Sequence, residues 1–186
     1  MNLVHRLCCS SGYWAKTVET KLLPWVLRGV ELGDTTLEIG PGYGANLRAL
    51  AGRTKLTAVE IDEPMANRLV NKYGDRARVL RGDGTDLQLP DADFDSVVCF
   101  TMLHHIPTVA LQDQMFNEVF RVLRPGGAFA GSDGVPSPMF RLLHIGDTCN
   151  PVDPETMADR LRRAGFTDVD TDAHGGEQRW RAVKPG

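Results

Sequence analysis

The clearest pattern of apolar and polar positions is a short apolar run, a group of glycines and a segment of helical spacing between Leu37 and Ala51. The run around Leu37 and Ile39 is interrupted by one acid, three glycines follow within five residues, and apolar residues recur at Leu47 and Leu50. This succession predicts a strand, a tight turn and a helix. Glycines suit the turn because a side chain would keep a ligand off the backbone, and because entry into the helix requires positive φ.

The acid in this stretch, Glu38, distinguishes two classes of ligand that bind such turns. The dinucleotide pattern G-x-G-x-x-G/A is satisfied by Gly40, Gly42 and Ala45. The acid-x-G-x-G-x-G pattern of S-adenosylmethionine (SAM) sites is satisfied by Glu38, Gly40, Gly42 and Gly44. A carboxylate repels a pyrophosphate, whereas it attracts a sulfonium and an ammonium group. Glu38 therefore favours SAM over a nicotinamide or flavin nucleotide; a purely structural glycine turn is the third interpretation.

Two further acids follow predicted strands. The strand pattern over residues 56–61 reaches Glu60 twenty residues after Gly40, a spacing at which a carboxylate accepts hydrogen bonds from both ribose hydroxyls of an adenosine. Asp83 follows the strand predicted at 77–81 and lies in a glycine loop, where it can accept a hydrogen bond from the adenine amino group. The structural alternatives are an exposed strand-end carboxylate for Glu60 and an Asx turn for Asp83.

Strand and helix patterns alternate along the middle of the chain. Asp62 is placed to cap a helix that runs to Tyr73, with Pro64 in its first turn. Further along, the pattern predicts a strand, a helix and a strand at residues 94–100, 108–123 and 128–132, with a sharp turn at 124–127. This alternation predicts a parallel sheet with helices on both faces.

The two ends of the chain depart from this alternation. Apolar residues at helical spacing predict a helix over 13–30, which Pro24 can kink. Residues 133–152 form a long predicted loop, after which Asp153 caps a helix that Gly165 ends. The chain closes with a predicted hairpin whose last strand is antiparallel to its neighbour, with strands at 167–172 and 178–183.

Composition and charge narrow the partners. At 186 residues with 42% hydrophobic and 24% charged residues, the chain has the composition of one globular domain. A net charge of −3 leaves no electrostatic footprint for nucleic acid. No apolar run is long enough for a membrane span, and no signal peptide is evident. The four cysteines, Cys8, Cys9, Cys99 and Cys149, include no C-x-x-C pair. This pattern indicates a reduced compartment without disulfides. We expect a cytoplasmic protein that is a monomer or a homodimer.

Four segments carry a resemblance to a known family. LEIGPGYG, AVEID, RGDGTDLQLPDADFDSVVCFTMLHHI and RVLRPGG resemble, in this order, the motifs of class I SAM-dependent methyltransferases, particularly the group that acts on small molecules and lipids. The resemblance covers residues 35–132, and the chain's ending is similar as well. It implies a Rossmann-like, doubly wound α/β sheet of seven strands in the order 3-2-1-4-5-7-6, with strand 7 antiparallel and helices on both faces.

The resemblance also implies a division of residues 1–186, taken as one methyltransferase domain. Its expected parts are an N-terminal helical cap or lid, a SAM-binding core, an acceptor-side loop, and a terminal helix with a β-hairpin, over residues 1–34, 35–132, 133–152 and 153–186. The sequence lacks the aromatic-flanked Pro-Pro motif of the methyltransferases that act on adenine and cytosine amino groups, because FTML stands after the fourth strand. This departure argues further against a nucleic-acid acceptor.

Carried over by position, the resemblance assigns the parts of the cofactor. The glycine turn with Glu38 would hold the methionine end, Glu60 the ribose, and Asp83 the adenine. The full set of expected cofactor-binding residues is Glu38, Gly40, Pro41, Gly42, Gly44, Glu60, Ile61, Asp83, Gly84, Phe100 and Thr101. SAM is the expected cofactor and S-adenosylhomocysteine the product.

The acceptor side is less defined. A sulfonium methyl is already activated, so a general base is needed only if the acceptor must lose a proton. Candidate bases are His104, His105 and His144, with Asp133 and Asp147 also in these loops. Since no pair of these residues has ligand spacing on a single element with supporting acids, no metal site is expected.

Two segments are expected to form the roof of the acceptor pocket. They are residues 13–25 and 133–152, which are rich in aromatic and aliphatic side chains and poor in lysine. Such walls suit an apolar or aromatic small molecule or a lipid headgroup as acceptor, and covering a sheet edge is the alternative role of both segments.

Three functions remain open on the sequence alone. The first is a SAM-dependent methyltransferase that acts on a small-molecule or lipid-like acceptor. The second is a nicotinamide-dependent oxidoreductase, which Glu38, the lack of a substrate domain and the lack of a Tyr-x-x-x-Lys pair disfavour. The third is a SAM-binding protein without catalysis. The sequence favours the first.

Overall fold

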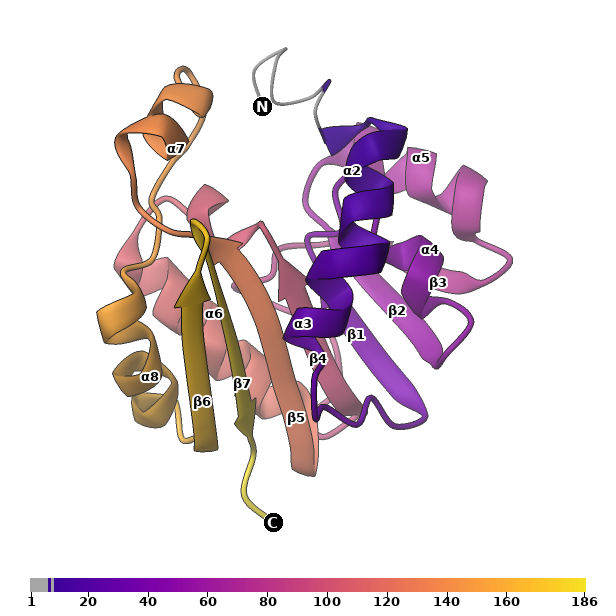
Figure 1. Cartoon of the computed structure of the whole chain (residues 1–186). Helices are drawn as coiled ribbons and strands as arrows, with labels where there is room; N and C mark the ends of the chain where they lie inside the picture. Colours follow the sequence, from indigo (N-terminus) through magenta and orange to yellow (C-terminus); the bar gives the residue numbers. More distant parts are fainter. Residues whose placement is uncertain (1–6, 8) are drawn as a thin grey trace.

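The computed structural model describes residue 7 and residues 9–186. These residues form a seven-stranded sheet in the order β3-β2-β1-β4-β5-β7-β6 (Figure 1). β7 pairs antiparallel with both β5 and β6, and the other neighbours pair parallel. The strands are β1 (Thr35–Ile39), β2 (Lys55–Glu60), β3 (Ala77–Arg81), β4 (Phe94–Phe100), β5 (Leu123–Gly134), β6 (Thr167–His174) and β7 (Glu177–Val183). The expected fold class, strand order and antiparallel last strand are confirmed.

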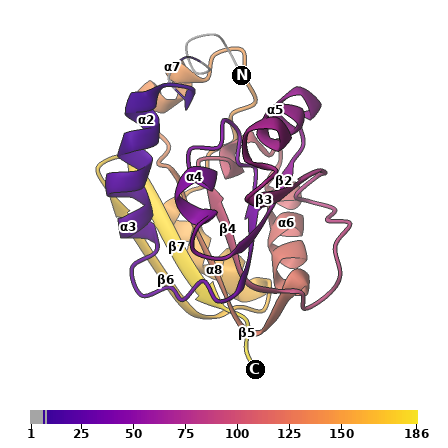
Figure 2. The ribbon, with the colours of Figure 1, turned by 90° about the vertical axis from the view of Figure 1, so that its right-hand side faces the viewer.

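The helices cover both faces of the sheet. They are α2 (Gly12–Thr17), the π-helix η1 (Val18–Leu22), α3 (Leu23–Val26), α4 (Leu47–Leu50), α5 (Glu63–Tyr73), the 3-10 helix η2 (Leu103–His105), α6 (Val109–Val122), α7 (Pro138–Leu143) and α8 (Pro154–Arg163). α2, α3 and α4 lie on one side of the sheet and α6 on the other (Figure 2). Each side has its own apolar core, with Leu23, Leu47 and Leu69 in one, and Phe116 and Trp180 in the other.

Local signals in the sequence begin and end several helices where expected. Asp62 caps α5 by accepting a hydrogen bond from the Met65 N–H, and Asp153 caps α8 in the same way from Glu155. Gly165 follows α8 with a φ of +101°, a conformation that favours glycine. The hairpin between β6 and β7 turns at Gly175, also with positive φ. These boundaries depend on residues close in sequence, which is why the sequence predicts them.

The structure differs from the predicted elements in the N-terminal helix. The expected helix over 13–30 is divided into α2, η1 and α3 and ends at Val26. In η1 the Leu23 N–H bonds to the Val18 carbonyl, one residue further back than in an α-helix. Pro24 has no N–H to donate, so the wider turn falls where a regular helical bond is missing. Residues 1–6 and 8, which belong to the expected cap and include Cys8, lie outside the described residues.

Two further differences concern β5 and the loop after it. β5 begins at Leu123, and its pairing with β4 is interrupted so that residues 124–127, the predicted turn, bulge from the strand. Residues 133–152 are not one continuous loop, because β5 continues to Gly134 and Ser137 caps the short helix α7. Figure 1 shows α2 and α7 beyond the same end of the sheet. Among the described residues, no helix has the length and apolar character that crossing a membrane requires.

Candidate functional site

A cavity of about 690 Å³ lies where β1, β2 and β4 end. Its walls include the residues that follow these strands, from Gly40, Ile61 and Thr101 onward. The chain leaves β1 toward β2 on one side, while β4 pairs on the other side, so the cavity occupies the switch point of a doubly wound sheet. Ligands of such sheets bind at this position.

The glycine turn contributes backbone to the cavity. Gly40 and Gly42 line it with φ values of +67° and +54°. A Cβ on Gly40 would stand 2.2 Å from Cγ of Met102, whereas a Cβ on Gly42 would meet no atom within 4 Å. A side chain at Gly42 would therefore extend into space that a ligand needs. Gly44 does not line the cavity; a Cβ there would stand 2.7 Å from Leu69 and 2.8 Å from Tyr73 of α5.

Glu60 is held at the end of β2 by two backbone groups. Its Oε2 accepts a hydrogen bond from the Gly42 N–H and its Oε1 from the Asp62 N–H, both at 3.0 Å. The side chain is 5% exposed and lines the cavity. Each carboxylate oxygen has a second lone pair, so these bonds orient the group and leave it able to accept from a ligand's hydroxyls.

Glu38 is buried beneath the turn. Its Oε1 accepts a hydrogen bond from Nδ2 of Asn46 at 3.0 Å, while its buried Oε2 has no hydrogen-bond partner among the described residues. Burial raises the pKa of Glu38 from 4.5 to about 7; the Asn46 hydrogen bond opposes this, and the negative charge of Glu60 adds to it. Two acids close together beneath a glycine turn fit a cationic ligand, because a positive charge would relieve both.

Asn46 is a site residue that the sequence reasoning missed. It lines the cavity, and its buried Oδ1 also has no partner among the described residues. The available signal was its position immediately before α4, where a polar side chain faces the turn. Other lining residues outside the expected set include Trp14, Val18, Met65, Thr85, Leu111 and Thr148. They come from helices and loops whose approach to the cavity depends on tertiary packing.

Asp83 forms the turn of its structural alternative and also lies at the cavity wall. Its Oδ1 accepts hydrogen bonds from the backbone N–H and the hydroxyl of Thr85, each at 2.8 Å, which is the Asx-type turn. Asp83 and Gly84 also line the cavity. The turn therefore fixes the side chain at the cavity wall. The expected residues that line the cavity are Gly40, Pro41, Gly42, Glu60, Ile61, Asp83, Gly84, Phe100 and Thr101.

Acidic side chains dominate the charge of the cavity wall. Four acids line it, and neither lysine nor arginine occurs among the described lining residues: the acids are Glu60, Asp62, Asp83 and Asp147. The wall nearest His105 and Ile106 is completed by residues 146–148, and Trp14 and Val18 contribute from the N-terminal helices. The cavity thus combines three acids at or just after the strand ends, and Asp147 from the loop after α7, with the apolar side chains Trp14 and Val18 of the N-terminal helices.

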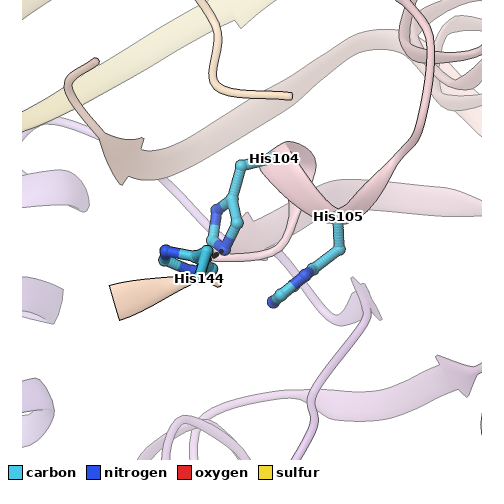
Figure 3. A group of neighbouring side chains, drawn as sticks. All are labelled: His104, His105 and His144. Carbon is cyan, nitrogen blue, oxygen red and sulfur yellow. Dashed lines mark hydrogen bonds between the residues drawn. The ribbon is translucent and has the colours of Figure 1, made fainter. Parts of the chain in front are cut away.

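Three histidines form a cluster beside the cavity. One ring nitrogen from each of His104, His105 and His144 lies within 4.8 Å of the others (Figure 3). Nε2 of His104 is 3.0 Å from Nε2 of His144, and Nδ1 of His104 is 2.5 Å from Oδ1 of the buried Asp133. Among the expected base candidates, His105 and Asp147 line the cavity, whereas His104, His144 and Asp133 lie behind its wall.

This cluster supplies the arrangement of ligands whose absence led to the expectation of no metal site. That expectation required two ligands with ligand spacing on one element together with a supporting acid. In the structure η2 supplies two histidines, the residue that follows α7 supplies the third, and Asp133 at the end of β5 is the acid. The sequence reasoning missed the group because 40 residues separate His104 from His144.

Comparison with known proteins places the chain among methyltransferases. A family model described as a methyltransferase domain matches residues 37–131. Sterol 24-C-methyltransferase of Eremothecium gossypii is 30% identical over 109 residues, which are 55% of this chain and 28% of that protein. A thiol S-methyltransferase of Mus musculus is 30% identical over 177 residues, which are 86% of this chain and 70% of that protein. The chain thus spans less than a third of the sterol enzyme.

A solved structure shows the same fold. Phosphoethanolamine N-methyltransferase 2 of Haemonchus contortus, in complex with SAM, superposes with a TM-score of 0.75 at 15% identity. The superposition covers 98% of this chain and 60% of that protein. At this identity the likeness concerns the fold.

Proposed function

The chain belongs to the class I SAM-dependent methyltransferase family, and on this premise we propose that it transfers a methyl group from SAM to a small, moderately apolar acceptor. The observation that carries the proposal is the cavity at the switch point, which has four acids and, among its described residues, no lysine or arginine. SAM supplies a methyl group that its sulfonium already activates, so positioning accounts for most of the rate.

The same observation argues against the nicotinamide alternative. A dinucleotide brings at least two negative phosphates to the glycine turn, where Glu38 and Glu60 are buried and neither lysine nor arginine is found among the described residues that line the cavity. SAM brings a sulfonium and an ammonium against one carboxylate, so its net charge is complementary. A noncatalytic SAM-binding protein shares this electrostatic fit and is separated from an enzyme by turnover.

The chain's own residues have distinct roles in the proposed complex. Glu60, oriented by the Gly42 and Asp62 N–H groups, accepts hydrogen bonds from the ribose hydroxyls. Glu38, with its unpartnered Oε2, and Asn46 serve the ammonium end of the cofactor. Asp83 and Gly84 receive the adenine, and Phe100 with Thr101 flank the methyl group. Gly44 takes a packing role and lets α5 approach the turn.

We assign the acceptor to the mouth of the cavity, between two segments. From the N-terminal cap, residues 1–34, Trp14 and Val18 line it, whereas Tyr13 is 81% exposed and Trp25 bonds to Asp172 on β6. From the acceptor-side loop, residues 133–152, only 146–148 line it among the described residues.

The remaining apolar side chains of the acceptor-side loop do not line the cavity. Met139, Leu142 and Leu143 are exposed on α7, and Phe140 packs against His104 and His144. Trp14 and Val18 are apolar side chains of the roof that remains, beside the polar Asp147 and Thr148, and this mixture suits a moderately apolar acceptor. The core, residues 35–132, binds the cofactor, and residues 153–186 complete the sheet.

Calorimetric titration tests the cofactor assignment. SAM and S-adenosylhomocysteine are expected to bind with dissociation constants of order micromolar, and NADH not to bind. Ligand at about 100 times its dissociation constant should raise the free energy of unfolding by about 2.7 kcal/mol. A melting temperature that does not change with SAM and rises with NADH refutes the proposal. Transfer of radiolabelled methyl groups into a panel of thiols, phenols and lipids separates an enzyme from a noncatalytic binder.

A further inference from the structure

The histidine cluster has the hydrogen-bonding arrangement of a metal centre. Nδ1 of His104 faces Oδ1 of Asp133 at 2.5 Å, and Nδ1 of His144 faces the Phe140 carbonyl at 2.7 Å. Nδ1 of His105 faces the Thr148 carbonyl at 3.2 Å. Metal-binding histidines bond to a carboxylate or a backbone carbonyl through one ring nitrogen, which fixes the tautomer and presents the other nitrogen to the metal. All three rings satisfy this rule through the same nitrogen.

If Nδ1 is protonated in both rings, the close approach of the two Nε2 atoms requires a proton or another cation between them. Nε2 of His104 and Nε2 of His144 are 3.0 Å apart, and if each Nδ1 donates its proton, both Nε2 atoms present lone pairs. Two lone pairs repel each other unless a proton or a cation lies between them. A metal ion can therefore take the place of the shared proton. The rings are also held by Phe140, whose centroid is 5.0 Å from that of His104 and 4.4 Å from that of His144.

The distances suit a tetrahedral ion. Zinc binds histidine nitrogen at about 2.0 to 2.1 Å, so two ligands of one tetrahedral ion stand roughly 3.4 Å apart. His104 and His144 are already near this separation, and the three nitrogens lie within 4.8 Å of one another. His105 is the most exposed of the three, so a rotation of its ring would close the remaining gap.

From this arrangement we infer that His104, His105 and His144 bind one Zn²⁺ ion through their Nε2 atoms, with Asp133 orienting His104. His105 lines the cavity and the other two lie behind it, so the fourth coordination position faces the proposed acceptor. Three protein nitrogens with one open position are the ligand set of catalytic zinc sites. The ion would lower the pKa of the acceptor's thiol or hydroxyl group, whose proton would leave to solvent, and would hold the resulting anion. The anion's sulfur or oxygen would then bond to the methyl carbon as the S–CH3 bond of SAM breaks and S-adenosylhomocysteine leaves. This role rests on the proposed function, but the ion's binding does not.

Zinc titration of the full chain tests the inference. Metal is first removed with a chelator, Zn²⁺ is then added against a chromophoric competitor, and Co²⁺ substitution reports tetrahedral geometry through its visible absorption. We expect one tight equivalent per chain. His105→Gln and His144→Gln should abolish it, and Asp133→Asn should weaken it about 10- to 100-fold because the orienting carboxylate is lost. His174→Gln is the matched control, since His174 is exposed in the hairpin and is not one of the three clustered histidines.

The outcomes separate this inference from the proposed function. Equal zinc affinity in the unsubstituted protein and in His105→Gln or His144→Gln, with unfolding curves that show folded variants, overturns the metal centre. Absence of zinc binding in the unsubstituted chain does the same and leaves a hydrogen-bonded cluster. SAM titration of the metal-free protein is run in parallel. SAM binding without zinc binding supports the function alone, and zinc binding without SAM binding supports the metal centre alone.

Discussion

Replacement of Glu38 by glutamine isolates the electrostatics of the site. The substitution retains the size of the side chain and an oxygen that accepts from Asn46, and it removes the buried charge. The pKa of Glu38 is raised by burial from 4.5 to about 7. Between these values the folded chain holds a proton that the unfolded chain has lost. The free energy of unfolding therefore falls as the pH rises from about 4.5 to about 7.

The size of the effect follows from the two pKa values. At about 1.4 kcal/mol per pH unit, the difference between 4.5 and about 7 corresponds to about 3 kcal/mol when Glu38 is fully ionised. About 2.5 kcal/mol of this should appear between pH 5 and pH 8, because Glu38 in the unfolded chain is already largely ionised at pH 5. The unsubstituted protein should lose that much more stability over this range than Glu38→Gln does.

Urea denaturation at pH 5, 6, 7 and 8 without SAM measures the difference. Groups that do not interact with Glu38 titrate equally in both proteins, so the separation between the two curves reports Glu38 together with its coupling to Glu60. Glu31→Gln, which removes an exposed carboxylate, is the control and should follow the unsubstituted protein. Saturating SAM should narrow the gap because its cation stabilises the ionised carboxylate. Parallel pH profiles for the unsubstituted protein and Glu38→Gln would refute the reasoning.

Three further predictions concern the cofactor site and its roof. Glu60→Ala should weaken SAM binding by about 1.5 to 3 kcal/mol in calorimetry, because an acceptor for two hydroxyls is lost; unchanged affinity in a folded variant contradicts the ribose role. Gly40→Ala should lose more stability than Gly126→Ala, because both have positive φ but only Gly40 would also bring a Cβ against a side chain, at 2.2 Å; equal losses near the 1–2 kcal/mol typical of a left-handed residue would show that the contact relaxes. In hydrogen exchange, residues 13–25 and 133–152 should gain protection with SAM if they act as a lid, and slow exchange in both states would identify fixed structure.

Much of the core could be predicted from the sequence because its signals are local. The strands at 77–81 and 94–100 have the predicted bounds, since each is a short strand pattern delimited by turn residues. Asp62 and Asp153 mark helix starts through hydrogen bonds to residues two or three positions away. The glycine turn, with Glu60 at the next strand end, predicts the cavity, because parallel strands bring their carboxyl ends to one edge.

Only the tertiary structure decided which distant segments come into contact, because no pattern in the sequence links residues so far apart. The sequence placed His144 in a loop, and the cap at Ser137 and the path of α7 bring it to His104. Asp133 reaches the same point because β5 continues beyond its predicted end. Which face of α2 meets the cavity is settled by packing, so Trp14 lines it. Helical spacing defines a side chain's neighbours on its own helix, but the direction in which a helix is docked depends on the rest of the chain.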